Sequence, residues 1–185
     1  MKAWPVGVVM ALSACASTGH PGDAFDPALA RSFAALVDSV SFSDSRYGWS
    51  ECCWRTLLVL RPRGNWTFVR LDSTIHWFEA PADSTTFRSI VARLVQLGFV
   101  AGWPPSFGST LSDVPVAVLT LRAPRQCHQT SASPATDGEA LPREWGAARA
   151  VLDSLAAHVE WQVRSPPRGA LVDHSSITPG FLCGA

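Results

Sequence analysis

The first periodic pattern along the chain is helical. Asp26 provides an N-cap acceptor, Pro27 suits the first helical position, and the apolar residues that follow recur at helical spacing as far as Val40. We therefore expect a helix over about 27–39. The next stretch, 41–51, is mostly polar and is interpreted as a connection before extended structure begins.

Two runs of β-branched and aromatic residues come next. They cover 54–60 and 66–71, and the segment from Pro62 to Asn65 between them has the composition of a turn. This pattern predicts a β-hairpin, which a third strand over 74–78 extends into a meander.

The clearest amphipathic helix pattern lies in the middle of the chain. Asp83 and Ser84 form a capping signal, and Gly98 marks the end of the pattern. The stretch 99–113 that follows is rich in Gly, Pro and Ser and predicts a loop. We expect the buried face of the helix to consist of Phe87, Ile90, Val91, Leu94 and Leu97.

Strand and helix patterns alternate once more in the C-terminal half. Strands are expected over 114–121 and 126–131, then an exposed loop over 131–140 and a last helix that opens at Leu141. This order predicts an α+β fold, a mainly antiparallel sheet (a β-meander plus later strands) with amphipathic helices packed on one face. The last helix should bury Trp145, Ala148, Leu152, Leu155 and Val159.

Composition narrows the class of protein. The sequence is 47% hydrophobic and 16% charged, which is typical of a globular chain and not of a disordered one. Its 15 Lys and Arg balance 15 Asp and Glu. A chain without basic excess lacks the electrostatic footprint of nucleic-acid binding, so we expect no nucleic-acid partner.

The N-terminus carries an export signal. Lys2 precedes an apolar stretch, 6–12, that is shorter than the roughly 20 residues a spanning helix needs. The run Leu12-Ser13-Ala14-Cys15 that ends it resembles the lipobox of bacterial lipoproteins. This resemblance implies cleavage before Cys15, a diacylglyceryl group on its sulfur, and acyl chains such as palmitate as the membrane anchor. Ala16 in place of an aspartate then implies the outer membrane, with the domain facing the periplasm.

These features divide the chain into four parts. We expect a lipoprotein signal peptide over 1–14, the lipidated cysteine and a flexible spacer over 15–25, a single α+β domain over 26–162, and a loosely ordered C-terminal tail over 163–185.

The domain also resembles a family as a whole. The order of elements over 46–161 is similar to that of a small secreted bacterial domain family of unknown function. The matching stretches are 55–70, 87–99 and Ser112 to Pro115, whereas 48–53 departs from the family's turn. The resemblance implies no activity and no cofactor.

Besides Cys15, the cysteines are Cys52, Cys53, Cys127 and Cys183. In an exported protein we expect disulfides among them, and the two neighbours rarely bond to each other. Cys52 therefore pairs with Cys127 and Cys53 with Cys183, or the two neighbours exchange partners. A zinc site built from Cys52, Cys53, Cys127 and His128 would lack the usual ligand spacing, so no metal site is expected.

Aromatic and basic residues are the candidate ligand contacts. Trp66 and Phe68 share one face of their strand, and Trp103 lies in a loop, so the three are possible contacts for a glycan. The commoner role of such residues is to fill the core, which we favour. The arginines around the hairpin could meet anionic glycans or lipid phosphates, although scattered arginines on a solvated face are ordinary; they are Arg55, Arg61, Arg63 and Arg70.

No catalytic motif is present. The chain lacks a Gly-x-Ser-x-Gly elbow, a His-Glu-x-x-His pair and a phosphate-binding glycine loop. Asp72 and His76 could be joined with a serine, but a turn separates them and their spacing does not demand convergence. We therefore expect no catalytic residue and a non-enzymatic envelope module that binds a protein or glycan partner or has a structural role. The alternative is a small envelope hydrolase with its site near His76 or in 99–113.

Overall fold

The computed structural model describes residues 27–46, 54–72, 74–100, 102–108, 116–133 and 141–166. Three helices and eight strands lie in this part of the chain. In chain order they are α1 (Pro27–Leu36), β1 (Ser39–Arg46), β2 (Trp54–Leu60), β3 (Asn65–Leu71), β4 (Ile75–Pro81), α2 (Ser84–Gln96), β5 (Ser106–Phe107), β6 (Ala117–Ala123), β7 (Gln126–Ala132), α3 (Arg143–His158) and β8 (Gln162–Arg164).

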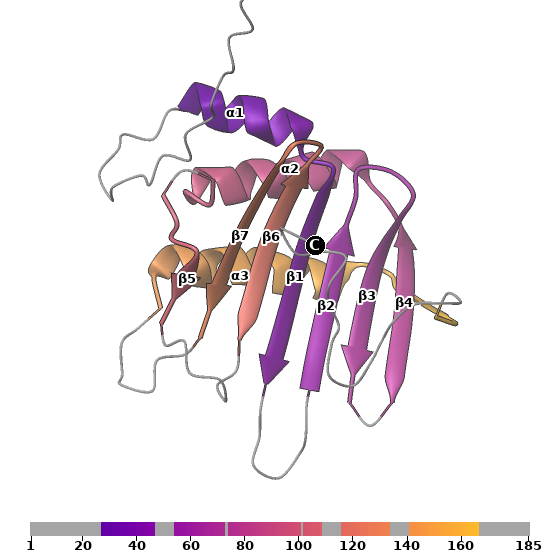
Figure 1. The fold of residues 1–185 in the computed structure, drawn as a ribbon. Coiled ribbons are helices and arrows are strands. Elements are labelled where there is room, and N and C mark those ends of the chain that lie inside the picture. Colours follow the sequence, from indigo (N-terminus) through magenta and orange to yellow (C-terminus); the bar gives the residue numbers. More distant parts are fainter. Residues whose placement is uncertain are drawn as a thin grey trace, which may run out of the picture.

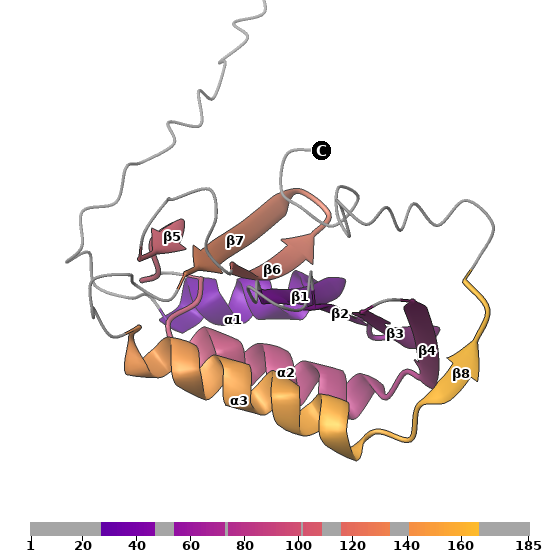
Figure 2. The ribbon, with the colours of Figure 1, turned by 90° about the horizontal axis from the view of Figure 1, so that it is seen from below.

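All strands belong to one sheet with the order β5-β7-β6-β1-β2-β3-β4-β8. Neighbouring strands are antiparallel except β5 and β7, which are parallel. Strands β1 to β4 form the meander (Figure 1). Helices α2 and α3 lie along one face of the sheet (Figure 2), so the predicted α+β fold with helices on one face is confirmed.

Strand register explains how the sheet meets these helices. On β1, Val40 and Phe42 pair with Leu60 and Leu58 and belong to the main hydrophobic core. Ser41 alternates with them and therefore points to the opposite face. Helix α1 contributes Phe33 to the same core, α2 contributes its apolar stripe, and α3 contributes Trp145, Ala148 and Leu152.

Strand β1 is the main departure from the sequence-based expectation. The first helix ends at Leu36 and not near residue 39, and β1 occupies much of the stretch 41–51 that we expected to be a connection. The strand lies between β6 and β2, near the centre of the sheet. Val40 continues the apolar spacing of the helix, but it is the first buried side chain of the strand.

The other long elements follow the predicted pattern. Helix α2 is capped by Asp83, whose carboxylate accepts hydrogen bonds from the backbone N–H groups of Thr85 and Thr86. The hairpin of β2 and β3 and the meander strand β4 are confirmed. Two short strands were not expected: β5, in the predicted loop, and β8, which pairs with β4 and crosses the predicted boundary between the domain, ending at 162, and the tail, beginning at 163.

A smaller apolar cluster lies on the face of the sheet away from these helices. Leu57, Val59, Val69 and Leu71 form it, and Ile75 and Trp77 pack against it. These residues alternate along β2, β3 and β4 with those that face the main core, so this part of the sheet has an apolar side chain on both faces.

Candidate functional site

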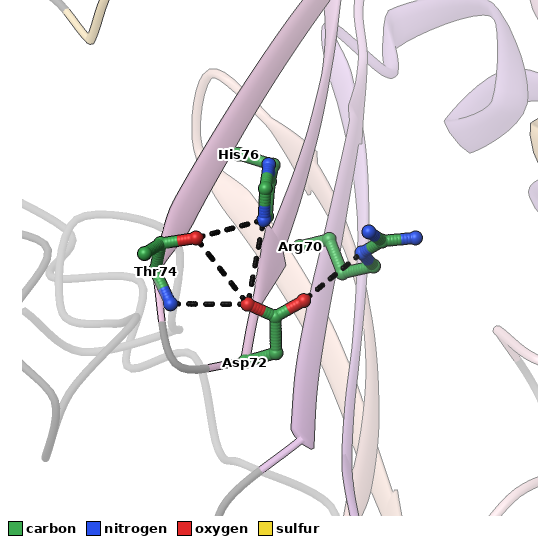
Figure 3. A network of polar contacts seen from close by, with 4 residues as sticks. All are labelled: Arg70, Asp72, Thr74 and His76. Atoms are coloured by element: carbon green, nitrogen blue, oxygen red, sulfur yellow. Dashed lines mark hydrogen bonds and ion pairs between the residues drawn. The ribbon is translucent and has the colours of Figure 1, made fainter.

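A polar network occupies the turn between β3 and β4 (Figure 3). Asp72 Oδ1 accepts a hydrogen bond from the backbone N–H of Thr74 at 3.0 Å and lies 3.3 Å from His76 Nε2. Asp72 Oδ2 lies 3.5 Å from Arg70 Nε. The structure brings Asp72 and His76 together although their spacing does not demand it, because the turn folds the carboxylate back toward the strand pair Arg70 and His76.

The network favours an ionised carboxylate. The hydrogen bond from the Thr74 backbone N–H is the largest cause that lowers the pKa of Asp72. Desolvation opposes it, and contacts with His76 and the charge of Arg70 add smaller lowering effects. A side chain that accepts a hydrogen bond from the backbone N–H two residues later forms an Asx turn. The short Asp72-Ser73-Thr74 sequence between two strands was the available signal for this turn.

The contacts of His76 do not match a hydrolytic relay. Thr74 Oγ1 lies 2.8 Å from His76 Nε2, the same ring nitrogen that faces Asp72. In a hydroxyl, histidine and carboxylate triad, the nucleophile and the acid contact opposite nitrogens of the ring, so that the acid orients the base. The observed geometry therefore fixes the hairpin turn and does not activate the Thr74 hydroxyl.

The candidate ligand-contact aromatics lie within or against the core. Trp66 is 3% exposed, and its indole N–H donates to the carbonyl of Arg61 at 2.8 Å. Phe68 is half-buried between Phe78 and Trp161, with ring centroids 5.8 and 5.6 Å away. These contacts make Phe68 part of the packing between β3, β4 and the segment after α3.

Trp103 has a similar structural role. Its indole N–H donates to the carbonyl of Leu97 at 2.8 Å, and its ring lies 5.1 Å from Phe99 and 5.6 Å from both Phe107 and Trp145. This aromatic cluster joins the segment 102–108 to α2 and α3, so these residues hold the loop in place.

Of the predicted cysteine and lipid sites, one lies in the described part of the chain. Cys127 on β7 is half-buried and is bonded in a disulfide. It alternates with His128, which faces the helices, so its sulfur lies on the opposite face of the sheet. Cys15, Cys52, Cys53 and Cys183 are outside the described residues, and both predicted pairings stay predictions.

In the part of the chain that the structure describes, no group of His, Cys, Asp and Glu could hold a metal ion. None of the described helices is long and apolar enough to cross a membrane.

A hollow of about 830 Å³ lies at the opposite end of the sheet from the Asp72 turn. It is enclosed by the end of α1, the turn between β2 and β3, and the start of α2. Phe87 and Val37 supply apolar lining, and two exposed arginines, Arg63 and Arg88, also line it. Of the four hairpin arginines singled out in the sequence, Arg61 and Arg63 lie at this end, Arg70 lies at the other, and the side chain of Arg55 is outside the described set.

Sequence reasoning missed Arg88 because it treated α2 only as a source of core residues. No periodic pattern connects Arg63 with Arg88, since the two are brought together by the return of the chain from β4 into α2. Comparison with known proteins adds no assignment: no family model matches the chain, and neither does any curated protein.

Proposed function

We propose that this chain is a lipid-anchored module of the bacterial cell envelope that acts by binding or by a structural role, without catalysis. Leu12-Ser13-Ala14-Cys15 supports the anchor, and Ala16 supports the outer membrane, with the domain on its periplasmic side. The similarity of 46–161 to a secreted bacterial domain of unknown function is consistent with this class.

One observation carries the non-enzymatic part of the proposal. Asp72 and Thr74 both contact Nε2 of His76, which is a turn-stabilising arrangement and not a relay. The aromatic candidates do not compete with this interpretation, because Trp66 and Trp103 direct their indole N–H groups to backbone carbonyls. We therefore propose that a partner binds the exposed surface of the domain, while the anchor holds the domain at the membrane.

The anchor can be tested by metabolic labelling with a clickable fatty acid. The wild-type chain should take up the label, and Cys15→Ala should not, because the acylated atoms belong to Cys15. Cys183→Ala is the matched control and should keep the label. Label that persists in Cys15→Ala would overturn the lipoprotein proposal.

A second candidate, a small envelope hydrolase, is favoured by the 3.3 Å approach of His76 to Asp72. It can be tested with a panel of ester and amide substrates on wild type and His76→Gln. We expect no turnover that depends on His76. Hydrolysis by the wild type that is lost in His76→Gln, with an unchanged melting temperature, would establish the hydrolase instead.

A further inference from the structure

We propose that the end of the sheet beside the junction of α1 and β1 binds anionic phospholipid headgroups. This binding would orient the domain on its membrane. The proposal rests on the lipid anchor proposed above and adds a surface and a partner to it. We call this surface the arginine end and define it by Arg31, Arg61, Arg63, Arg88 and Arg125.

Strand register places Arg61, Arg63 and Arg125 at one end of the molecule, where Arg88 lines the hollow and α1 carries Arg31. The start of β1 pairs with the end of β2 through Val40 and Leu60, and with the end of β6 through Ser39 and Arg122. The turns from β2 to β3 and from β6 to β7 therefore lie beside the junction of α1 and β1, as Figure 1 shows. Arg61 and Arg63 belong to the first turn and Arg125 to the second.

The arginine end carries positive charge on exposed side chains. All five side chains of the arginine end are exposed. Within the described ranges, three acidic residues lie near this end: Asp38 between α1 and β1, Asp83, which caps α2, and Glu79, whose carboxylate accepts a hydrogen bond from Asn65 at the start of β3. By contrast, Arg149 elsewhere in the fold forms ion pairs with Asp44 and Asp153. An anionic surface is the complement of such an unbalanced arginine cluster.

The residues that line the hollow are suited to binding a phospholipid headgroup. Arg63 and Arg88 line it, and guanidinium groups bind phosphate oxygens through paired hydrogen bonds. Phe87 and Val37 supply an apolar lining against which the carbon skeleton of a lipid can lie. The first amides of α2 already donate to Asp83, so recognition of the phosphate falls on the two arginines and not on the helix end.

An exposed apolar side chain lies beside this hollow. Leu36, at the end of α1, is 60% exposed, and its neighbours Ala34 and Ala35 line the hollow. In the described part of the chain, the only other large apolar side chain so exposed is Val163 on β8, at the far edge of the sheet. An apolar side chain among arginines is typical of a surface that rests in the headgroup region of a bilayer.

The position of the anchor selects a membrane over an acidic protein as the partner. The chain reaches α1 at Pro27, and the predicted spacer over 15–25 separates it from Cys15. A segment of that length spans at most about 3.5 Å per residue, which keeps α1 within reach of the bilayer. Because α1 lies at the arginine end (Figure 1), the anchor joins the described domain from this end.

The test is vesicle co-sedimentation of the mature chain, residues 15–185, with Cys15→Ser, which has every described element but no lipid. We expect binding to vesicles that contain phosphatidylglycerol, no binding to vesicles of phosphatidylcholine alone, and weaker binding as salt is added. Arg63→Gln and Arg125→Gln should each weaken binding about five-fold, and Leu36→Ser should also weaken it.

Matched controls distinguish binding by the arginine end from a general effect of positive charge or of exposed apolar side chains. Arg143→Gln, at the exposed start of α3, and Val163→Ser should leave binding unchanged, and all variants should keep the wild-type melting temperature. Equal binding to both kinds of vesicle, or an equal loss with Arg143→Gln, would overturn the proposal. Binding to polyglutamate without binding to phosphatidylglycerol would also overturn it and would identify an acidic protein as the partner.

The two proposals fail separately. Vesicle binding by the unlipidated chain does not depend on acylation, whereas fatty-acid labelling does not depend on the arginines. Absence of label would thus remove the anchor, and absence of vesicle binding would remove the docking surface.

Discussion

His128 lies on β7 with its ring against α1. The ring meets Phe33 edge-on, with centroids 4.7 Å apart and an interplanar angle of 82°. Burial lowers the pKa of His128, because the imidazolium would lose hydration between the sheet and the helix. The neutral ring is therefore part of the packing that holds α1 on the sheet.

Stability should consequently depend on pH below the ordinary range of histidine. The unfolded chain takes up a proton at His128 near the ordinary pKa of 6.5, and the folded chain does so only at lower pH. The unfolded state then binds more protons, so stability is present above pH 6.5 and is lost as pH falls through the folded pKa.

Urea unfolding between pH 7 and pH 5 measures this effect. We expect the free energy of unfolding to decrease over that range in the wild type and to decrease less in His128→Gln. His174→Gln, which changes a histidine outside the described residues, is the matched control and should behave as the wild type. Asp72 and Asp83 do not contribute to the change between pH 7 and pH 5, because their pKa values are lowered below the ordinary value of 3.8. An unchanged slope in His128→Gln would show that another group titrates.

At the scale of elements, β5 depends on a close approach of two backbones. Ser131 and Ser133 donate backbone hydrogen bonds to the carbonyls of Pro105 and Phe107, at 3.0 and 3.1 Å. Gly108, which follows β5, has a φ of +81°, and a Cβ atom there would collide with the carbonyl oxygen of Ser133. Only glycine satisfies both the left-handed conformation and the lack of space.

Three glycine variants separate these two requirements. Gly108→Ala should lower the free energy of unfolding by more than the roughly 1–2 kcal/mol that a left-handed residue costs. Gly64→Ala, with a φ of +84° and open space around it, should show the conformational cost alone. Gly146→Ala, in open space within α3, should stabilise the helix by about 0.5–1 kcal/mol. Equal effects at Gly108 and Gly64 would mean that β5 moves away without cost.

Helices and strands with a long periodic pattern of apolar residues could be predicted from the sequence. Short strands that exist only through pairing with a neighbouring strand could not. Helix α2 has both a cap and an apolar stripe, and both were found in the sequence. Strand β1 was missed because Val40 continues the helical spacing of α1, although the alternation of serine with Val40 and Phe42 over 39–43 was a strand signal. Strands β5 and β8 have too few residues for any period, and their pairing with β7 and β4 defines them.

At the scale of the whole molecule, the arrangement of polar groups depended on turns and on long-range returns of the chain. Asp72 and His76 converge because an Asx turn redirects the carboxylate, a local feature that spacing along a strand does not express. Arg63 and Arg88 converge because β3, β4 and the start of α2 return the chain to the same end of the sheet. The positions of the buried aromatics were easier to anticipate, since filling the core is their usual role.

The predicted disulfides would link distant parts of the chain, and their connectivity can be tested decisively. With denaturant and no reductant, an alkylating reagent should leave Cys127 unmodified, because its sulfur is bonded. Replacing Cys127 with Ser should free its partner and lower the free energy of unfolding by about 2–4 kcal/mol.

Mass mapping of the alkylated Cys127→Ser variant then identifies that partner. Label on Cys52 supports the pairing of Cys52 with Cys127, which leaves Cys53 for Cys183, and label on Cys53 supports the exchanged pairing. Label on Cys183 would contradict both, because it would leave the neighbours Cys52 and Cys53 to each other. Cys127 lies on the face of the sheet away from His128 and α1, so its loss should not alter the pH dependence expected of His128. A changed slope in this variant would mean that the disulfide and the packing of α1 are coupled through the sheet.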